Sequence, residues 1–201
     1  MPARLVVLAS GSGTTLQAMI DATRVPDYGV EVVAIGSDRP GIGALARAKG
    51  AGIAHFVCRV VDFPDRTAWD LALTERVAAL APDLVLSAGF MKLVGPGFLA
   101  AFGGRYVNSH PALLPAFPGM HGARDALDYG VKISGCTLFV VDGGVDSGPI
   151  IDQRPVPVAE DDTEETLHER IKLAERDMLV DVIGRMARNG WTVENRRVRI
   201  Q

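Results

Sequence analysis

The chain has 201 residues, of which 48% are hydrophobic and 22% charged, with a formal net charge of −3, which is typical of an ordinary soluble globular protein. This charge leaves no basic surplus for nonspecific nucleic-acid binding, and no segment is apolar enough for a signal peptide or a membrane span. We therefore expect neither nucleic-acid nor membrane partners. Cys58 and Cys136 form neither a CxxC pair nor a metal cluster, so we expect no disulfide framework and a cytoplasmic protein.

The amino-terminal half alternates short apolar runs with helical patterns. The apolar runs lie at 5–9, 30–35, 54–57 and 83–88, and the helical patterns lie at about 14–23, 42–49 and 66–81. Such runs are typical of strands buried on both faces, and their alternation with helices predicts βαβ units and a parallel sheet. We therefore expect a ligand at the carboxyl ends of these strands.

The first strand-to-helix turn, within LASGSGTTLQAMI, is rich in glycine. Backbone N–H groups at a helix start, which glycines allow a ligand to approach, form an anion site. The third glycine of the dinucleotide fingerprint is replaced by Leu16, although Asp38 lies where a ribose-binding acid would be, and the P-loop lysine is missing. We expect a small monophosphate held by Gly13, Thr14 and Thr15; a tight turn without a ligand is the alternative.

After about residue 104 the pattern changes. Strands are expected at 105–108, 132–141 and 149–157, a long helix at about 163–188 with Thr163 as its N-cap, and a weakly indicated final strand at 191–200. The short connections between the strands predict a partly antiparallel continuation of the same sheet. The predicted fold class is therefore α/β: a Rossmann-like, mostly parallel sheet flanked by helices, with an antiparallel carboxy-terminal portion, in a single domain.

A polar pair stands at the end of the strand expected at 105–108, in the sequence NSHPALLP. Asn108 and His110 are two positions apart and therefore share a face of the strand. Asp142 and Asp146, in the glycine-rich FVVDGGVDSGPI, are candidates for a carboxylate partner that would orient the imidazole and favour its charged form. An amide and an imidazolium together can stabilise an oxyanion that develops on a carbonyl carbon. Without an evident Ser or Cys nucleophile, this pattern indicates acyl transfer or hydrolysis by direct attack, although a lone histidine is more often structural.

Four segments, SGSGTTLQA, APDLVLSAGFMKLV, NSHPALLPAFPGMHG and DGGVDSGPI, resemble the folate-dependent formyltransferases. The resemblance runs from residue 4 to about residue 188. It implies a transferase that moves the formyl group of 10-formyltetrahydrofolate, a cosubstrate, to an amine without a metal; the glycine-rich turn and the chain length favour glycinamide ribonucleotide as the acceptor, in purine biosynthesis. It also implies one domain over residues 1–201, with a phosphate-binding half at about 1–104 and a catalytic and folate-binding remainder at about 105–201.

The resemblance further implies roles for individual residues. His110 would be the general acid and oxyanion partner, Asn108 would bind the formyl oxygen, and Asp146 would orient His110 and relay a proton. The ribonucleotide would be held by Gly13, Thr14, Thr15, Lys172 and Glu175. The folate would be held by Arg66, Met91, Lys92, Leu93, Val94, Asn108, Asp142, Gly143, Gly144, Val145 and Asp146. For Arg66, a solvated charge at a helix start is the alternative.

Two positions near the expected site are unusual. Glu175 falls within the apolar arc of the helix expected at 163–188, where an unpaired carboxylate is costly. A ligand amine or hydroxyl would compensate it, and an internal salt bridge is the alternative. Ser109 stands between Asn108 and His110, where the family commonly has a large aliphatic residue. Its side chain is expected on the opposite face of the strand, so the chemistry should survive.

Three other functions stay open beside formyl transfer to glycinamide ribonucleotide. They are formyl transfer to an aminoacyl-tRNA or a sugar nucleotide, hydrolysis of the formyl donor, and binding of a nucleotide or folate without catalysis. The tRNA and hydrolase relatives carry an extra domain for which this chain has no room, and an intact Asn108, His110 and Asp146 argue against a binding module. Small-molecule substrates are the expected partners, and a homodimer through the long helix or an edge strand is also considered.

Overall fold

The computed structural model describes residues 1–201 and divides into two compact units, residues 1–108 and 109–201. This division lies close to the predicted change of character near residue 104. The large sheet has the strand order β3-β2-β1-β4-β5-β6-β7, and strand β5 (Tyr106–His110) crosses from the first unit to the second. The α/β class with a mostly parallel sheet flanked by helices is therefore confirmed, whereas folding of residues 1–201 as one domain stays a prediction.

The first unit contains the parallel part of the sheet. Its strands are β1 (Ala3–Ala9), β2 (Val30–Ser37), β3 (Ala54–Val57), β4 (Leu84–Ser87) and the start of β5, and neighbouring strands pair in parallel. All four residues of β4 are buried, as the apolar runs predict for strands covered on both faces. Because the strands are parallel, their carboxyl ends share one edge of the sheet.

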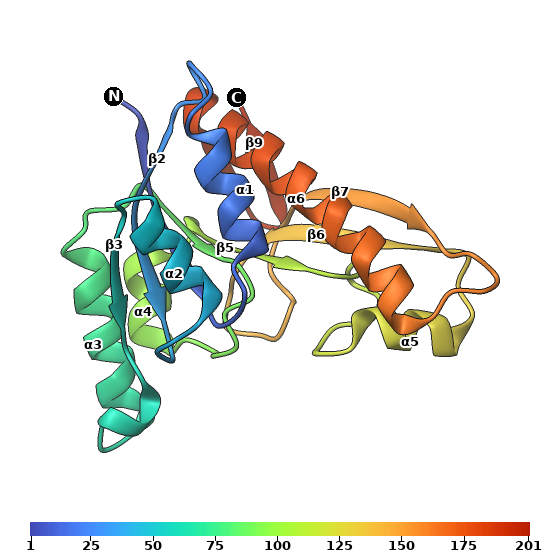
Figure 1. Ribbon diagram of the computed structural model, residues 1–201, viewed down its shortest axis with the longest axis horizontal. Helices are drawn as coiled ribbons and strands as arrows, with labels where there is room; N and C mark the ends of the chain where they lie inside the picture. The colour runs from blue at the N-terminus through green and yellow to red at the C-terminus, as the bar shows by residue number, and fades with distance from the viewer. The chain divides into compact units, whose positions relative to one another are not determined.

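The helices of the first unit pack in two pairs (Figure 1). They are α1 (Thr14–Ala22) with α2 (Gly43–Gly50), and α3 (Arg66–Ala78) with α4 (Pro96–Phe102); a 3₁₀ turn covers Val60–Asp62. Helix α4 was not predicted, because it is only 7 residues long and contains a proline and a glycine. Its two buried aromatic residues, Phe98 and Phe102, pack with their ring centroids 4.6 Å apart and their planes tilted by 52°, and they hold the helix against the core.

The start of α4 is capped by Asp70, a buried residue of α3. Its carboxylate accepts hydrogen bonds from the backbone N–H groups of Gly95, at 2.5 Å, and Phe98, at 3.1 Å. A Cβ atom at Gly95 would lie 2.7 Å from the carboxyl carbon of Asp70, so any other residue there would displace this carboxylate. One buried carboxylate therefore satisfies two of the helix-start donors that would otherwise be unpaired.

The second unit contains two antiparallel pairs of strands and two helices. They are β6 (Ile133–Val140) with β7 (Ile150–Pro157), β8 (Trp191–Glu194) with β9 (Arg197–Ile200), α5 (Gly122–Tyr129) and α6 (Glu164–Asn189). The prediction of one strand at 191–200 was wrong: a turn with Asn195 at φ 56° divides it into a separate hairpin. The predicted N-cap of α6 is confirmed, since Thr163 and Thr166 form a reciprocal capping box.

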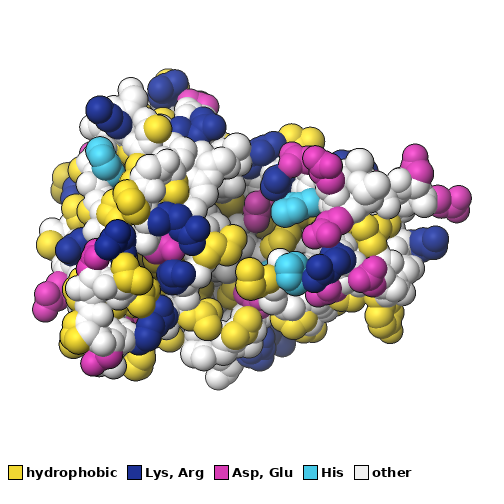
Figure 2. All heavy atoms as spheres, turned by 60° about the horizontal axis from the view of Figure 1, so that its bottom comes forward, with side chains coloured by type: hydrophobic (Ala, Val, Ile, Leu, Met, Phe, Trp, Pro, Cys, Tyr) yellow, Lys and Arg dark blue, Asp and Glu magenta, His cyan; other side chains and the backbone are white.

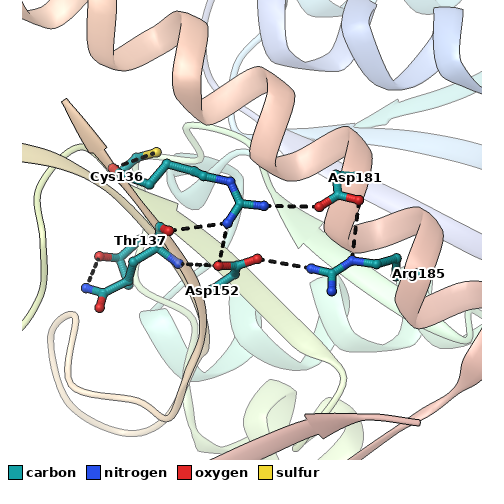
Figure 3. A network of polar contacts seen from close by, with 7 residues as sticks. Cys136, Thr137, Asp152, Asp181 and Arg185 are labelled. Carbon is teal, nitrogen blue, oxygen red and sulfur yellow. Dashed lines mark hydrogen bonds and ion pairs between the residues drawn. The ribbon is translucent and has the colours of Figure 1, made fainter.

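A network of ion pairs joins β7 to α6 (Figure 3). The side chains of Asp181 and Arg185 project from α6 toward Asp152 on β7, and Arg185 lies 3.0 Å from Asp152. Arg154 bridges the same elements, at 2.6 Å from Asp152 and 3.0 Å from Asp181. Each pair is partly exposed and contributes little alone, but the closed network fixes the long helix against the sheet.

Both cysteines are free and buried. Burial raises the thiol pKa of Cys58, and it raises the thiol pKa of Cys136 to about 12. Because the thiolate is the reactive form, both side chains act as small core residues.

The surface carries charges of both signs. On the face drawn in Figure 2, basic and acidic side chains are interspersed and neither sign forms a broad patch. No helix in the structure is both long enough and apolar enough to span a membrane. The chain also contains no group of three or more His, Cys, Asp or Glu side chains placed to hold a metal ion.

Candidate active site

His110 lies at the end of β5 and is 4% exposed. The strand runs through His110, two residues further than predicted, so Asn108 and His110 belong to one regular strand and share a face. The Nε2 atom of His110 lies 2.7 Å from the carbonyl oxygen of Phe117, and Nδ1 lies 3.4 Å from a carboxylate oxygen of Asp146. Both contacts are to acceptors, so an imidazole that donates to both must carry hydrogen on both ring nitrogens.

The two residues that face His110 have unusual backbone conformations. Phe117 has φ 55° and Asp146 has φ 50°, both in the left-handed region that favours glycine. The Asp146 carboxylate also accepts a hydrogen bond of 2.8 Å from the N–H of Gly119, so the segment around Phe117 and the loop around Asp146 are tied together. Strained backbone of this kind concentrates at functional sites, where the surrounding structure maintains it. The Leu114–Pro115 peptide bond, which sequence reasoning could not assign, is cis.

Only one of the two candidate carboxylates reaches His110. Asp142 instead accepts hydrogen bonds from its own loop, at 3.0 Å from Gly144 N and 2.7 Å from Ser147 Oγ. Residues 143–145 of this loop are exposed. The structure therefore distinguishes Asp142, which hydrogen-bonds within its own loop, from Asp146, which faces His110.

Glu175, on α6, is held by Ser109. The Ser109 hydroxyl donates a hydrogen bond of 2.7 Å to Glu175 Oε1, whereas Lys172 pairs with Glu169 at 2.7 Å on the helix surface. Burial raises the pKa of Glu175, although the Ser109 hydrogen bond and the neighbouring charge of His110 act in the opposite direction. The sequence left an internal salt bridge of Glu175 open as an alternative. The structure instead gives Glu175 a hydroxyl partner, Ser109, that the sequence did not indicate.

In the first unit, the glycine-rich turn leads directly into α1. Gly13 has φ 74°, and a Cβ atom there would lie 2.6 Å from the Cα atom of Ala44, so packing alone requires glycine. Thr14 and Thr15 form the first turn of α1, which begins without a side-chain cap. The N–H groups of this turn are therefore left to water or a ligand. A phosphate there stays a prediction, because the turn is also explained by its packing.

The segment 91–95, which follows β4, is held to the rest of the first unit by side chains. The contacts are Met91 N to Ser10 Oγ at 2.9 Å, Lys92 Nζ to Asp38 at 3.6 Å, the Leu93 carbonyl to the Arg66 guanidinium, and Gly95 N to Asp70 at 2.5 Å. The side chains of Met91 and Leu93 are nevertheless 62% and 66% exposed. The segment thus presents apolar side chains from a fixed backbone, and Val94 beside them is half-buried.

Arg66 is placed by two contacts in the first unit. Its guanidinium lies 4.5 Å from the ring centroid of Trp69 and donates to the carbonyl of Leu93. This position differs from that of a freely solvated charge, the alternative for Arg66. A stacked guanidinium keeps further N–H donors for a carboxylate.

Asp38 is not free to bind a ribose. Its side chain is 1% exposed and lies 3.0 Å from Arg39 and 3.6 Å from Lys92. Burial raises the pKa of Asp38, but hydrogen bonds from Arg39 and Ser10 and the charges of Arg39 and Lys92 outweigh it and lower the pKa overall. Asp38 is therefore not available as the ribose-binding acid that a dinucleotide site would need.

A hollow of about 870 Å³ lies elsewhere in the first unit. It is lined by residues at the amino ends of β1 and β2, including Pro2, Gly29 and Val30. Ligands of open α/β sheets bind at the carboxyl ends of the strands. This hollow is therefore not the candidate active site.

Comparison with known proteins decides the family. Residues 3–183 match the family model described as formyl transferase. The chain belongs to this formyl transferase family. It is 55% identical over 195 residues to the phosphoribosylglycinamide formyltransferase of Mycobacterium tuberculosis, covering 97% of this chain and 90% of that protein. The resemblance inferred from the sequence is confirmed.

Two further relatives extend the comparison of this formyl transferase. The crystal structure of glycinamide ribonucleotide transformylase 1 from Symbiobacterium toebii superposes with a TM-score of 0.95 at 46% identity, over 99% of this chain and 94% of that one. The trifunctional purine biosynthetic protein adenosine-3 of Drosophila melanogaster is 46% identical over 174 residues, which are 86% of this chain and 13% of that protein. The match therefore covers a small part of a longer protein in the fly and nearly a whole protein in the bacteria.

Proposed function

We propose that this formyl transferase moves the formyl group of 10-formyltetrahydrofolate to the amine of glycinamide ribonucleotide, giving formylglycinamide ribonucleotide in de novo purine biosynthesis. The observation that carries the proposal is the buried His110, which faces Asp146 and shares a strand face with Asn108. The names of the relatives from M. tuberculosis and S. toebii support glycinamide ribonucleotide as the acceptor. Membership of the family supports a folate-derived formyl donor.

The reaction begins with attack of the substrate amine on the formyl carbon. Attack places negative charge on the formyl oxygen, which the Asn108 amide and the His110 imidazolium stabilise by hydrogen bonds. The amine then loses a proton, the folate nitrogen gains one, and the tetrahedral intermediate collapses to formylated product and tetrahydrofolate. Asp146 relays this proton between the two nitrogens, so no covalent intermediate with the protein forms.

The Phe117 carbonyl occupies the hydrogen-bonding position that this mechanism assigns to the formyl oxygen. His110 Nε2 lies 2.7 Å from it, while Nδ1 faces Asp146. Exchange of the Phe117 carbonyl for the formyl oxygen keeps both ring nitrogens paired and preserves the contact with Asp146.

The remaining proposed roles concern binding. Gly13, Thr14 and Thr15 hold the phosphate with the N–H groups at the start of α1, while Lys172 and Glu175 contact the rest of the ribonucleotide. Met91, Lys92, Leu93 and Val94 with residues 142–146 contact the folate ring, and the Arg66 guanidinium binds a carboxylate of the folate tail. No step of this mechanism uses a metal. We also propose a cytoplasmic location and consider a homodimer.

The test is formyl transfer by the purified protein. Loss of 10-formyltetrahydrofolate is followed with and without glycinamide ribonucleotide, and the formylated product is identified by mass spectrometry. Consumption that requires the ribonucleotide supports the proposal. Consumption without it would indicate hydrolysis of the donor, and no consumption in either case would indicate another acceptor or a binding module.

A further inference from the structure

Ser109 is a polar residue of β5 to which the proposed reaction assigns no role. It lies between Asn108 and His110, and alternation along the strand directs its side chain to the opposite face. Its hydroxyl donates a hydrogen bond of 2.7 Å to Glu175 Oε1. One strand end therefore serves two faces, with Asn108 and His110 on one and Ser109 on the other.

We propose that Ser109 is a positioning residue for the amine substrate: it fixes the Glu175 carboxylate so that its second oxygen, Oε2, receives an N–H or O–H group of that substrate. The proposal rests on the proposed function, in which Glu175 contacts the ribonucleotide. A carboxylate on a flexible glutamate has several rotamers, and an anchored oxygen restricts them before the substrate arrives. Ser109 therefore contributes to substrate affinity and orientation without touching the reacting atoms.

The surroundings of Glu175 explain why an anchor matters. Burial raises the pKa of this carboxyl group, so the charged form that binds an amine is disfavoured. The Ser109 hydrogen bond acts in the opposite direction, together with the charges of His110 on β5 and of Lys172 and Arg176 on α6. The thiol of Cys136 on β6 also faces this group, but its pKa of about 12 keeps it neutral. Ser109 is the only one of these groups that hydrogen-bonds the carboxylate.

The test compares Ser109→Thr with Ser109→Val. These two side chains have nearly the same shape and differ in a hydroxyl against a methyl group, so any effect of the added volume is common to both. We expect Ser109→Val to lower kcat/KM for glycinamide ribonucleotide about tenfold relative to Ser109→Thr, which is the weight of one hydrogen bond to a charged group. The KM for 10-formyltetrahydrofolate should be equal in the two variants. Ser109→Ala provides a third variant if the larger side chains do not fold.

A pH profile separates positioning from a purely structural role. Loss of the hydroxyl removes an interaction that favours the carboxylate, so the acid limb of kcat/KM for the ribonucleotide should move to higher pH in Ser109→Val and stay in place in Ser109→Thr. In a background of Glu175→Ala, the difference between the two variants in kcat/KM should vanish, because the acceptor that the Ser109 hydroxyl anchors is gone.

Two results would overturn the inference. Equal kcat/KM values for Ser109→Thr and Ser109→Val would show that the hydroxyl has no role. Equal losses toward both substrates, with a lowered melting temperature, would show that Ser109 supports the fold alone. Failure of the proposed function itself is distinguishable, because the wild-type protein would then not formylate the ribonucleotide at all.

Discussion

The two segments proposed to contact the folate ring are held in different ways. The 91–95 segment is held by side chains that are distant in sequence. Ser10, which binds Met91, is 81 positions away, and Asp70, which binds Gly95, is 25 positions away. In the 142–148 segment, Asp142 accepts hydrogen bonds from two groups at most 5 positions away. The distant contacts of this segment include that of Asp146 with His110 and a hydrogen bond from Arg196 to the Ser147 carbonyl. Substitutions in the first segment should therefore lower the free energy of unfolding, and substitutions in the second should lower the rate of formyl transfer.

The largest effect is expected in the 142–148 segment. Asp146→Asn removes the negative charge that faces His110 Nδ1 and keeps the shape of the side chain. We expect kcat to fall by about 10² to 10⁴, the usual weight of a positioned acid–base group, with little change in melting temperature. The control is Asp128→Asn, an exposed carboxylate on α5, which should leave kcat unchanged. A fall of less than twofold for Asp146→Asn would contradict the assigned role.

The next effect is expected at the anchor of the 91–95 segment. Asp70→Ala leaves the N–H groups of Gly95 and Phe98 without their buried partner and should lower the free energy of unfolding by about 3 kcal/mol, measured by urea denaturation. Asp65→Ala removes an ordinary N-cap of α3, whose carboxylate accepts one hydrogen bond from Ala68 N, and should lower the free energy of unfolding by about 1 kcal/mol. Equal costs for the two variants would show that Asp70 is no more than a helix cap.

Replacement of Glu175 should raise the stability of the folded protein, whereas the preceding substitutions lower activity or stability. Its pKa is raised in the folded protein, so the folded state loses stability relative to the unfolded state as pH rises through the folded pKa. Glu175→Gln should therefore be more stable than wild type at pH 8, and the gain should disappear below the ordinary glutamate pKa of 4.5. Melting curves at several pH values test this. A variant that is less stable at pH 8 would show that the carboxylate stabilises the fold.

The smallest effects on stability are expected for two serines: Ser10, which binds the 91–95 segment, and Ser147, which lies in the 142–148 segment. Ser10→Ala removes the acceptor of the Met91 N–H and a donor to buried Asp38, so it should lower the free energy of unfolding by about 1 kcal/mol and raise the folate KM. Ser147→Ala removes only the local bond to Asp142 and should change stability by less than about 0.5 kcal/mol. The reverse order of the two stability changes would overturn the contrast between the segments.

Much of this architecture follows from local patterns. The parallel strands were predicted because they are apolar runs between helical patterns, and Asn108, His110 and Asp146 because a polar pair at a strand end and a glycine-rich loop are visible in sequence. Helix α4 was missed because it is short, and because its start is also capped by Asp70, which comes from another helix. The same argument that found Glu175 would have found Asp70, since it shares a helical face with buried Leu73 and Val77.

The missed parts of the site depend on tertiary contacts. Ser109 was expected only to leave the chemistry intact, because its side chain points to the opposite face of the strand. The packing of α6 brings Glu175 to it. The Phe117 carbonyl is a backbone group, so no residue type could have indicated that it would face His110. In the glycine-rich turn before α1, a residue was visible in the sequence but its purpose was not. Gly13 is required by its close contact with Ala44, and the sequence pattern alone could not tell a glycine needed for packing from one needed for phosphate binding.

The two buried cysteines make this protein ready for site-selective labelling. At neutral pH neither native thiol is ionised or accessible, so maleimide reagents should leave both unmodified. A cysteine introduced at exposed Val145 or exposed Leu93 would then be the single reactive thiol in the folded chain. A fluorophore attached there would report the arrival of folate at either segment without any prior removal of native cysteines.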